Sequence, residues 1–250
     1  MIKSMSTPPP FHSLPFHVEI FTLMPGMFEQ TLKTSILGRG LKENIWQLSL
    51  QNIRDYSCDK HQTVDDAPYG GGAGMVMRAD VLDNALQHAS HPCAPIFYLS
   101  PRGQKLTQHM CKDIIKNKAI TIICGRFEGV DQRVIDFYNM REISLGDFIM
   151  TGGEIAAMAM VDSCVRLLPG VLGDDTSVDE ESFCNDLLEY PHYTRPQIWR
   201  DISVPDILLS GHHEQVRIWR QQMAEAVTEK KRPDMWKKYC KNNKSSVKGR

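Results

Sequence analysis

The sequence predicts an α/β fold, in which a mostly parallel sheet carries helices on both faces. Short apolar segments with strand-like patterning alternate along the chain with segments whose apolar residues recur at helical spacing. Such alternation requires crossover connections, which join parallel strands through helices on the two faces of the sheet. The alternation ends near Gly173, after which the chain becomes acidic and then more helical and basic. We therefore also expect a small, mostly helical C-terminal domain.

The first part of the chain contains five expected strands and five expected helices. The strands are residues 17–24, 45–53, 95–99, 119–124 and 141–145. The first four helices are residues 27–37, 80–89, 106–115 and 131–138.

The last of these helices is predicted to begin near Glu154. Thr151 and Glu154 have the spacing of a capping box. An apolar stripe then runs to Pro169-Gly170, and consists of Ile155, Met158, Val161, Val165 and Leu168. In the second part of the chain, residues 214–228 form the clearest expected helix.

The composition predicts four parts. Residues 1–16 are expected to be a flexible extension, 17–173 a ligand-binding domain, 174–190 an acidic interdomain linker, and 191–250 a helical domain with a basic tail. The linker has seven acids and no base, whereas residues 230–250 have nine Lys or Arg and one acid. Such a tail is either a site of contact with RNA phosphates or a solvated end.

Bulk composition excludes several classes of protein. Hydrophobic residues make up 42% and charged residues 24%, as in ordinary soluble domains. No apolar run approaches the roughly 20 residues that cross a bilayer. The seven cysteines are odd in number and never spaced C-x-x-C, which argues against disulfides and structural zinc and favours the reducing cytoplasm. Cys124 and Cys164 are expected in the core.

Three glycine-bearing segments follow predicted strands, at residues 98–103, 124–129 and 144–153. Ligands of parallel sheets bind at the carboxyl ends of the strands, and glycines let the backbone approach them closely. Glycines at such positions also serve simply as turns. The chain has no G-x-x-x-x-G-K-[ST], and no G-x-G-x-x-G follows a strand, which disfavours a nucleoside triphosphate or NAD as the ligand.

These segments belong to a longer series of motifs, which runs from about His17 to about Trp236. Around the expected ligand site the motifs are YLSPRGQKL (98–106), GRFEGVDQRV (125–134), GDFIMTGGE (146–154) and PGVLG (169–173). Elsewhere they are TVDDAPYGGG (63–72), LEYPHYTRP (188–196), LLSGH (208–212) and KRPD (231–234). In this order they resemble the bacterial tRNA (guanine-N1)-methyltransferases of the TrmD type.

The resemblance implies a homodimer whose α/β domain is a trefoil-knotted SPOUT fold, an exception to the rule against threaded chains. It implies transfer of a methyl group from S-adenosylmethionine to N1 of the guanosine immediately 3′ of the anticodon in tRNA, which prevents frameshifting. The target would lie near the subunit interface. The residues that the resemblance assigns to the cofactor are Tyr98, Leu99, Ser100, Pro101, Gly125, Glu128, Gly129, Ser144, Leu145, Gly146, Phe148, Met150, Gly152 and Gly153.

The reaction needs a base and a cation. Guanine N1 must lose its proton, and negative charge then develops on O6. The resemblance assigns the cation to Arg166, which from the residues alone reads as a cation at a helix C-terminus. It assigns the base to Glu181, where the family usually has aspartate. Asp179 would take this role if the linker shifts by two residues.

Other motif residues are expected to contact tRNA. Asp65 would read a guanine edge, and His192, Tyr193 and Arg195 would contact the flipped base or the RNA backbone, or else pack an interdomain joint. Glu128 would face the positive methionine end of the cofactor, or else be a charge at a helix N-terminus.

No cluster of metal ligands is visible in the sequence. The resemblance suggests that the reaction requires Mg²⁺. Such an ion would arrive with the RNA or be held transiently by carboxylates. Two rival interpretations remain: a knotted methyltransferase acting on rRNA or on another tRNA position, and an RNA-binding protein that has lost its catalytic base.

Overall fold

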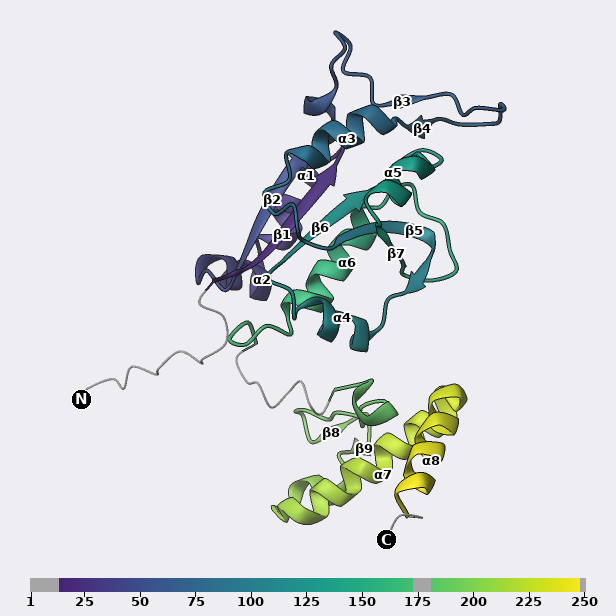
Figure 1. Ribbon diagram of the computed structural model, residues 1–250. Helices are drawn as coiled ribbons and strands as arrows, with labels where there is room; N and C mark the ends of the chain where they lie inside the picture. The colour runs from purple at the N-terminus through teal and green to yellow at the C-terminus, as the bar shows by residue number, and fades with distance from the viewer. Residues whose placement is uncertain (1–13, 173–180, 248–250) are drawn as a thin grey trace, which may run out of the picture. The chain divides into compact units, whose positions relative to one another are not determined.

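A five-stranded sheet forms the centre of the first of two units, Met1–Gly173 and Asp174–Arg250 (Figure 1). The computed structural model describes residues 14–172 and 181–247. The strands are β1 (Phe16–Thr22), β2 (Trp46–Asn52), β5 (Ile96–Lys105), β6 (Ala119–Cys124) and β7 (Arg141–Ser144). Their order is β2-β1-β6-β5-β7, and every neighbouring pair is parallel. The predicted parallel α/β sheet is therefore confirmed.

Helices pack on both faces of this sheet, as the sequence predicts (Figure 1). One face is covered by α1 (Gly26–Leu32), α2 (Ser35–Lys42), α4 (Gln108–Ile114) and α6 (Glu154–Val165). The other is covered by α3 (Ala79–Gln87) and α5 (Gln132–Phe137).

The central strand β6 shows why two separate cores form. Ile120, Ile122 and Cys124 pack into the first core, whereas Ile123 packs into the second. Successive strand side chains point to opposite faces, so a strand that is apolar throughout supplies both layers. Cys124 and Cys164 are completely buried, which confirms their predicted place in the core.

The single helix predicted over residues 27–37 is wrong, because the chain forms α1 and α2 there instead. Thr34 is extended, with φ −115° and ψ 166°. Its hydroxyl donates to the carbonyl oxygens of Gln30 at 3.0 Å and Thr31 at 3.2 Å. A hydroxyl that bonds the preceding turn competes with continuation of the helix, and this ends α1.

The predicted capping box at the start of α6 is also wrong. The residue before the helix is Gly153, and no side chain caps it. Glu154 is buried, with 1% of its surface exposed, and Ile155 of the predicted stripe is 53% exposed. Because α6 is apolar on nearly every side, its pattern does not reveal which face is buried.

Short elements complete the first unit. The 3-10 turn η1 (Ile53–Tyr56) follows β2. The strands β3 (Asp65–Asp66) and β4 (Val76–Met77) pair in antiparallel fashion. The residues between them, 67–75, are called the glycine-rich loop below.

The second unit contains α7 (His213–Lys231) and α8 (Pro233–Val247), which pack together. A hairpin of β8 (Ile198–Trp199) and β9 (Ile202–Ser203) and two 3-10 turns, η3 (Cys184–Asp186) and η4 (Asp206–Leu209), precede them. None of the helices in the described parts of either unit is long and apolar enough to span a membrane.

The part of the acidic segment that the structure describes, residues 181–190, packs on these helices. Thr228 of α7 is buried, and its Oγ1 accepts the N–H of Leu188 at 2.8 Å. Asp186 pairs with Lys238 of α8 at 2.6 Å. Residues 1–13, most of the predicted extension, and 174–180 of the predicted linker lie outside the described residues. Phe16, placed in that extension by the sequence, is the buried first residue of β1.

Candidate active site

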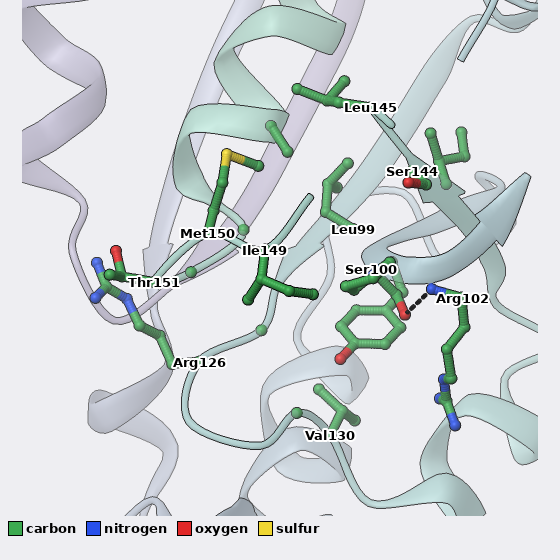
Figure 2. A pocket seen from close by; sticks show the side chains of 18 of the residues that line it. Leu99, Ser100, Arg102, Arg126, Val130, Ser144, Leu145, Ile149, Met150 and Thr151 are labelled. Atoms are coloured by element: carbon green, nitrogen blue, oxygen red, sulfur yellow. Dashed lines mark hydrogen bonds between the residues drawn. The ribbon is translucent and has the colours of Figure 1, made fainter. Parts of the chain in front are cut away.

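A cavity of about 360 Å³ lies at the carboxyl ends of β5, β6 and β7, where side chains from all three glycine-bearing segments surround it (Figure 2). All fourteen residues that the sequence assigns to the cofactor line this cavity. Eight lining residues were not predicted: Arg102, Arg126, Phe127, Val130, Ile143, Ile149, Thr151 and Ala156. Seven of them lie within or next to one of the three segments, and Ala156 lies three residues after the third, so proximity in the chain was the signal for them.

The first segment forms part of the wall through an irregularity in β5. The register of β5 against β7 shifts between Leu99 and Gln104, so the intervening residues leave the ladder although the strand continues. Ser100 Oγ accepts the N–H of Arg102 at 3.2 Å, which holds this bend (Figure 2).

The second and third segments are joined directly. The N–H of Gly153 donates to the carbonyl oxygen of Gly125 at 2.9 Å, and Arg126 and Gly152 form an isolated antiparallel bridge. A Cβ on Gly153 would lie 2.9 Å from the Cα of Cys124, so the backbones could not approach this closely with any larger residue.

A buried carboxylate holds this junction. Glu154 Oε1 accepts the hydroxyl of Thr22 at 3.0 Å, and the guanidinium Nε of Arg126 lies 3.2 Å from Oε1 and 3.1 Å from Oε2. A buried carboxylate needs such partners because burial removes its hydration. Sequence reasoning missed this role; the signal was an acid at the first position of a helix whose next seven residues are apolar.

Replacing Arg126 by methionine should therefore destabilise the first unit. Glu154 would stay buried with only the Thr22 hydroxyl as a partner, and we expect the free energy of unfolding to fall by about 2 to 4 kcal/mol. Arg133→Met is the matched control, because the Arg133 side chain is 75% exposed in its pair with Asp131. Urea unfolding measures both variants, and equal losses would contradict the structural role of Arg126.

Burial sets the protonation of Tyr98, which lines the cavity, and of Cys124, which lies in the core next to Gly125. It raises the pKa of the Tyr98 phenol, which therefore stays protonated at neutral pH. Burial, and next the charge of Glu154, raise the pKa of the Cys124 thiol well above its usual value. Cys124 is therefore a neutral core residue and not a nucleophile.

Comparison with known proteins decides the family. A model of the family tRNA (Guanine-1)-methyltransferase TrmD matches residues 16–238. The chain belongs to the TrmD family. A tRNA (guanine-N(1)-)-methyltransferase of Ruegeria sp. (strain TM1040) is 50% identical over 224 residues, which cover 88% of this chain and 92% of the relative. Its counterpart in Pelagibacter ubique (strain HTCC1062) is 49% identical over 227 residues, 91% of this chain and 100% of the relative.

Two other residues assigned through the TrmD motifs belong to the first unit, and neither is part of the cavity wall. Arg166 is the C-terminal cap of α6, where its N–H donates to the carbonyl oxygen of Asp162 at 3.2 Å. Asp65 lies on β3, at the start of the hairpin that carries the glycine-rich loop. Neither lines the cavity.

The remaining TrmD motif residues belong to the second unit. Glu181 lines a separate hollow formed with α7 and α8. His192 is exposed and pairs with Glu189, Nε2 to Oε1, at 2.8 Å. The Tyr193 ring centroid is 6.3 Å from that of Trp219, and Arg195 is exposed. Asp179, the alternative base, lies outside the described residues.

Proposed function

We propose that this protein transfers a methyl group from S-adenosylmethionine to N1 of the guanosine immediately 3′ of the anticodon in tRNA, which prevents frameshifting. The observation that carries the proposal is the cavity at the ends of β5, β6 and β7. Three motifs of a tRNA methyltransferase family, far apart in the sequence, meet around it.

The lining of the cavity fits the methyl donor. Its volume, about 360 Å³, lies within the roughly 300 to 1,000 Å³ of small-molecule sites. Apolar side chains such as Leu99, Leu145 and Met150 suit the adenine ring, and the loop backbones offer polar groups to the ribose. The carboxylate of Glu128 suits the ammonium group of the methionine end. Bound there, S-adenosylmethionine supplies an electrophilic methyl group.

The chain's own residues then act on the guanine. Glu181 accepts the N1 proton, which turns a poor nucleophile into a good one. The guanidinium of Arg166 stabilises the negative charge that develops on O6. The cavity walls contribute by orientation, since in-line displacement depends on the placement of the reacting atoms.

We also propose that the first unit is trefoil-knotted. The edge strand β7 pairs with β5 only, yet Gly152 and Gly153 contact the end of β6 on the far side of β5. Residues 145–153 therefore cross the carboxyl end of β5, and this crossing supports a threaded chain.

The active form is proposed to be a homodimer with the target guanosine near the subunit interface. Several large apolar side chains near the cavity and on the helices beside it are exposed, and burial against a second subunit would remove them from water. They are Met27, Phe127, Phe148, Ile149 and Ile155.

Recognition of tRNA involves, in this proposal, Asp65 of the first unit and a group in the second: His192, Tyr193, Arg195 and the basic tail. Lysine and arginine side chains along α7 and α8 suit contact with phosphates. Among the residues that the structure describes, no group of three or more His, Cys, Asp or Glu could hold a metal. Any Mg²⁺ would accompany the RNA or bind carboxylates transiently. We place the enzyme in the cytoplasm, with its substrate.

A transfer assay tests the proposal. Purified protein is mixed with S-adenosylmethionine labelled in its methyl group and with tRNA that carries G or A next to the anticodon. We expect label only in the G form. Label in both forms, or in rRNA, would instead identify an enzyme of different specificity, and no label would identify an RNA-binding protein without activity.

A further inference from the structure

The glycine-rich loop is attached to the cavity segment that follows β6. The N–H of Met77 donates to the carbonyl oxygen of Gly129, and the N–H of Glu128 to that of Met75, both at 2.9 Å. The N–H of Asp131 donates to the carbonyl oxygen of Met77 at 3.2 Å. Met77 is completely buried. The end of the loop, the strand β4 that follows it and residues 128–131 thus form one hydrogen-bonded structure.

Gly74 is the point where this loop meets the Glu128 side chain. A Cβ on Gly74 would overlap Oε1 of Glu128 and lie 2.8 Å from its Cδ. Gly70, in the same loop, has nearly the same φ, +85° against +84° for Gly74. A Cβ on Gly70 would have no neighbour within 4 Å. The two glycines therefore differ in their surroundings and not in their φ.

We propose that Gly74 is a positioning residue for the methyl donor. Because Gly74 has no side chain, the Glu128 carboxylate can lie beside the cavity in the space that a Cβ at position 74 would occupy. The inference rests on the proposed function, in which this carboxylate faces the ammonium group of S-adenosylmethionine. Glu128 is exposed, so its carboxylate would swing away from a methyl group at position 74 at little cost to folding. The displaced carboxylate would instead weaken the binding of S-adenosylmethionine.

The test compares Gly74→Ala with Gly70→Ala by isothermal titration calorimetry, in the absence of tRNA. Both glycines have a φ in the left-handed region, within 1° of each other, so Gly70→Ala is a control matched in φ. We expect Gly74→Ala to bind S-adenosylmethionine about tenfold more weakly, as when a hydrogen bond to a charged group is lost. Gly70→Ala should bind like the parent. 5′-Methylthioadenosine, which has no amino-acid end, should bind equally to all three proteins.

A double-mutant cycle separates positioning from general damage. In a Glu128→Ala background, adding Gly74→Ala should have no further effect on binding. A loss that persists in this background, or Gly74→Ala binding like the parent, would overturn the inference alone. A parent protein that binds no S-adenosylmethionine would overturn both the inference and the proposed function.

Discussion

Replacing Glu181 by glutamine is expected to slow methyl transfer by about 10²- to 10⁴-fold, the usual contribution of a general base. Glutamine keeps nearly the size and shape of the side chain but cannot accept the N1 proton. S-Adenosylmethionine should bind with unchanged affinity, because every residue that lines the cavity belongs to the first unit. Single-turnover kinetics and calorimetric titration measure the two quantities separately.

Asp179 provides the control for this experiment. Asp179→Asn removes a carboxylate two positions away in the sequence of the same acidic segment and should leave the rate close to that of the parent. If Asp179→Asn abolishes transfer while Glu181→Gln does not, the base is Asp179. Parental rates for both variants would exclude a linker carboxylate from the reaction.

Replacing Arg166 by methionine should lower the single-turnover rate by about 10²- to 10³-fold, the cost of removing one stabilising donor from a developing oxyanion. Arg166→Lys distinguishes catalysis from a helix-end role. Lysine keeps the positive charge at the C-terminus of α6 and therefore the favourable interaction with the helix dipole. It lacks the planar fork of guanidinium donors, so a catalytic role predicts a loss of at least about tenfold.

The urea concentration at which half of the protein is unfolded tests whether Arg166→Lys also changes stability. Arg166→Lys should unfold at the same urea concentration as the parent. A parental transfer rate in Arg166→Lys, with unchanged stability, would show that Arg166 acts only as a cation at the helix end.

Much of the fold could be predicted from the local pattern of apolar and polar residues in the sequence. The strand predicted over 119–124 has the bounds of β6, because a short apolar run between a charged residue, Lys118, and a turn-forming glycine, Gly125, indicates a buried strand. The break between α1 and α2 was missed because it depends on how the Thr34 hydroxyl bonds the preceding turn. Periodicity reports the apolar face of a helix and is insensitive to such an interruption.

In the candidate site, too, some features could be predicted from the sequence and others depend on contacts that only the folded chain makes. The fourteen cofactor assignments came from motifs, and the topology of a parallel sheet explains why distant motifs meet at one edge. Glu154 was misread because a capping box is a local pattern. Its partners, Thr22 and Arg126, lie 132 and 28 positions away in the chain. Only the folded structure brings such groups together.

The most direct test of the central claim is the chemical identity of the product. Transfer-RNA with guanosine next to the anticodon is incubated with the protein and S-adenosylmethionine, digested to nucleosides, and analysed by chromatography with mass spectrometry. The account predicts 1-methylguanosine from that one position, and none from the tRNA carrying adenosine there. Methylation at another guanine atom, or at another position of the tRNA, would contradict it.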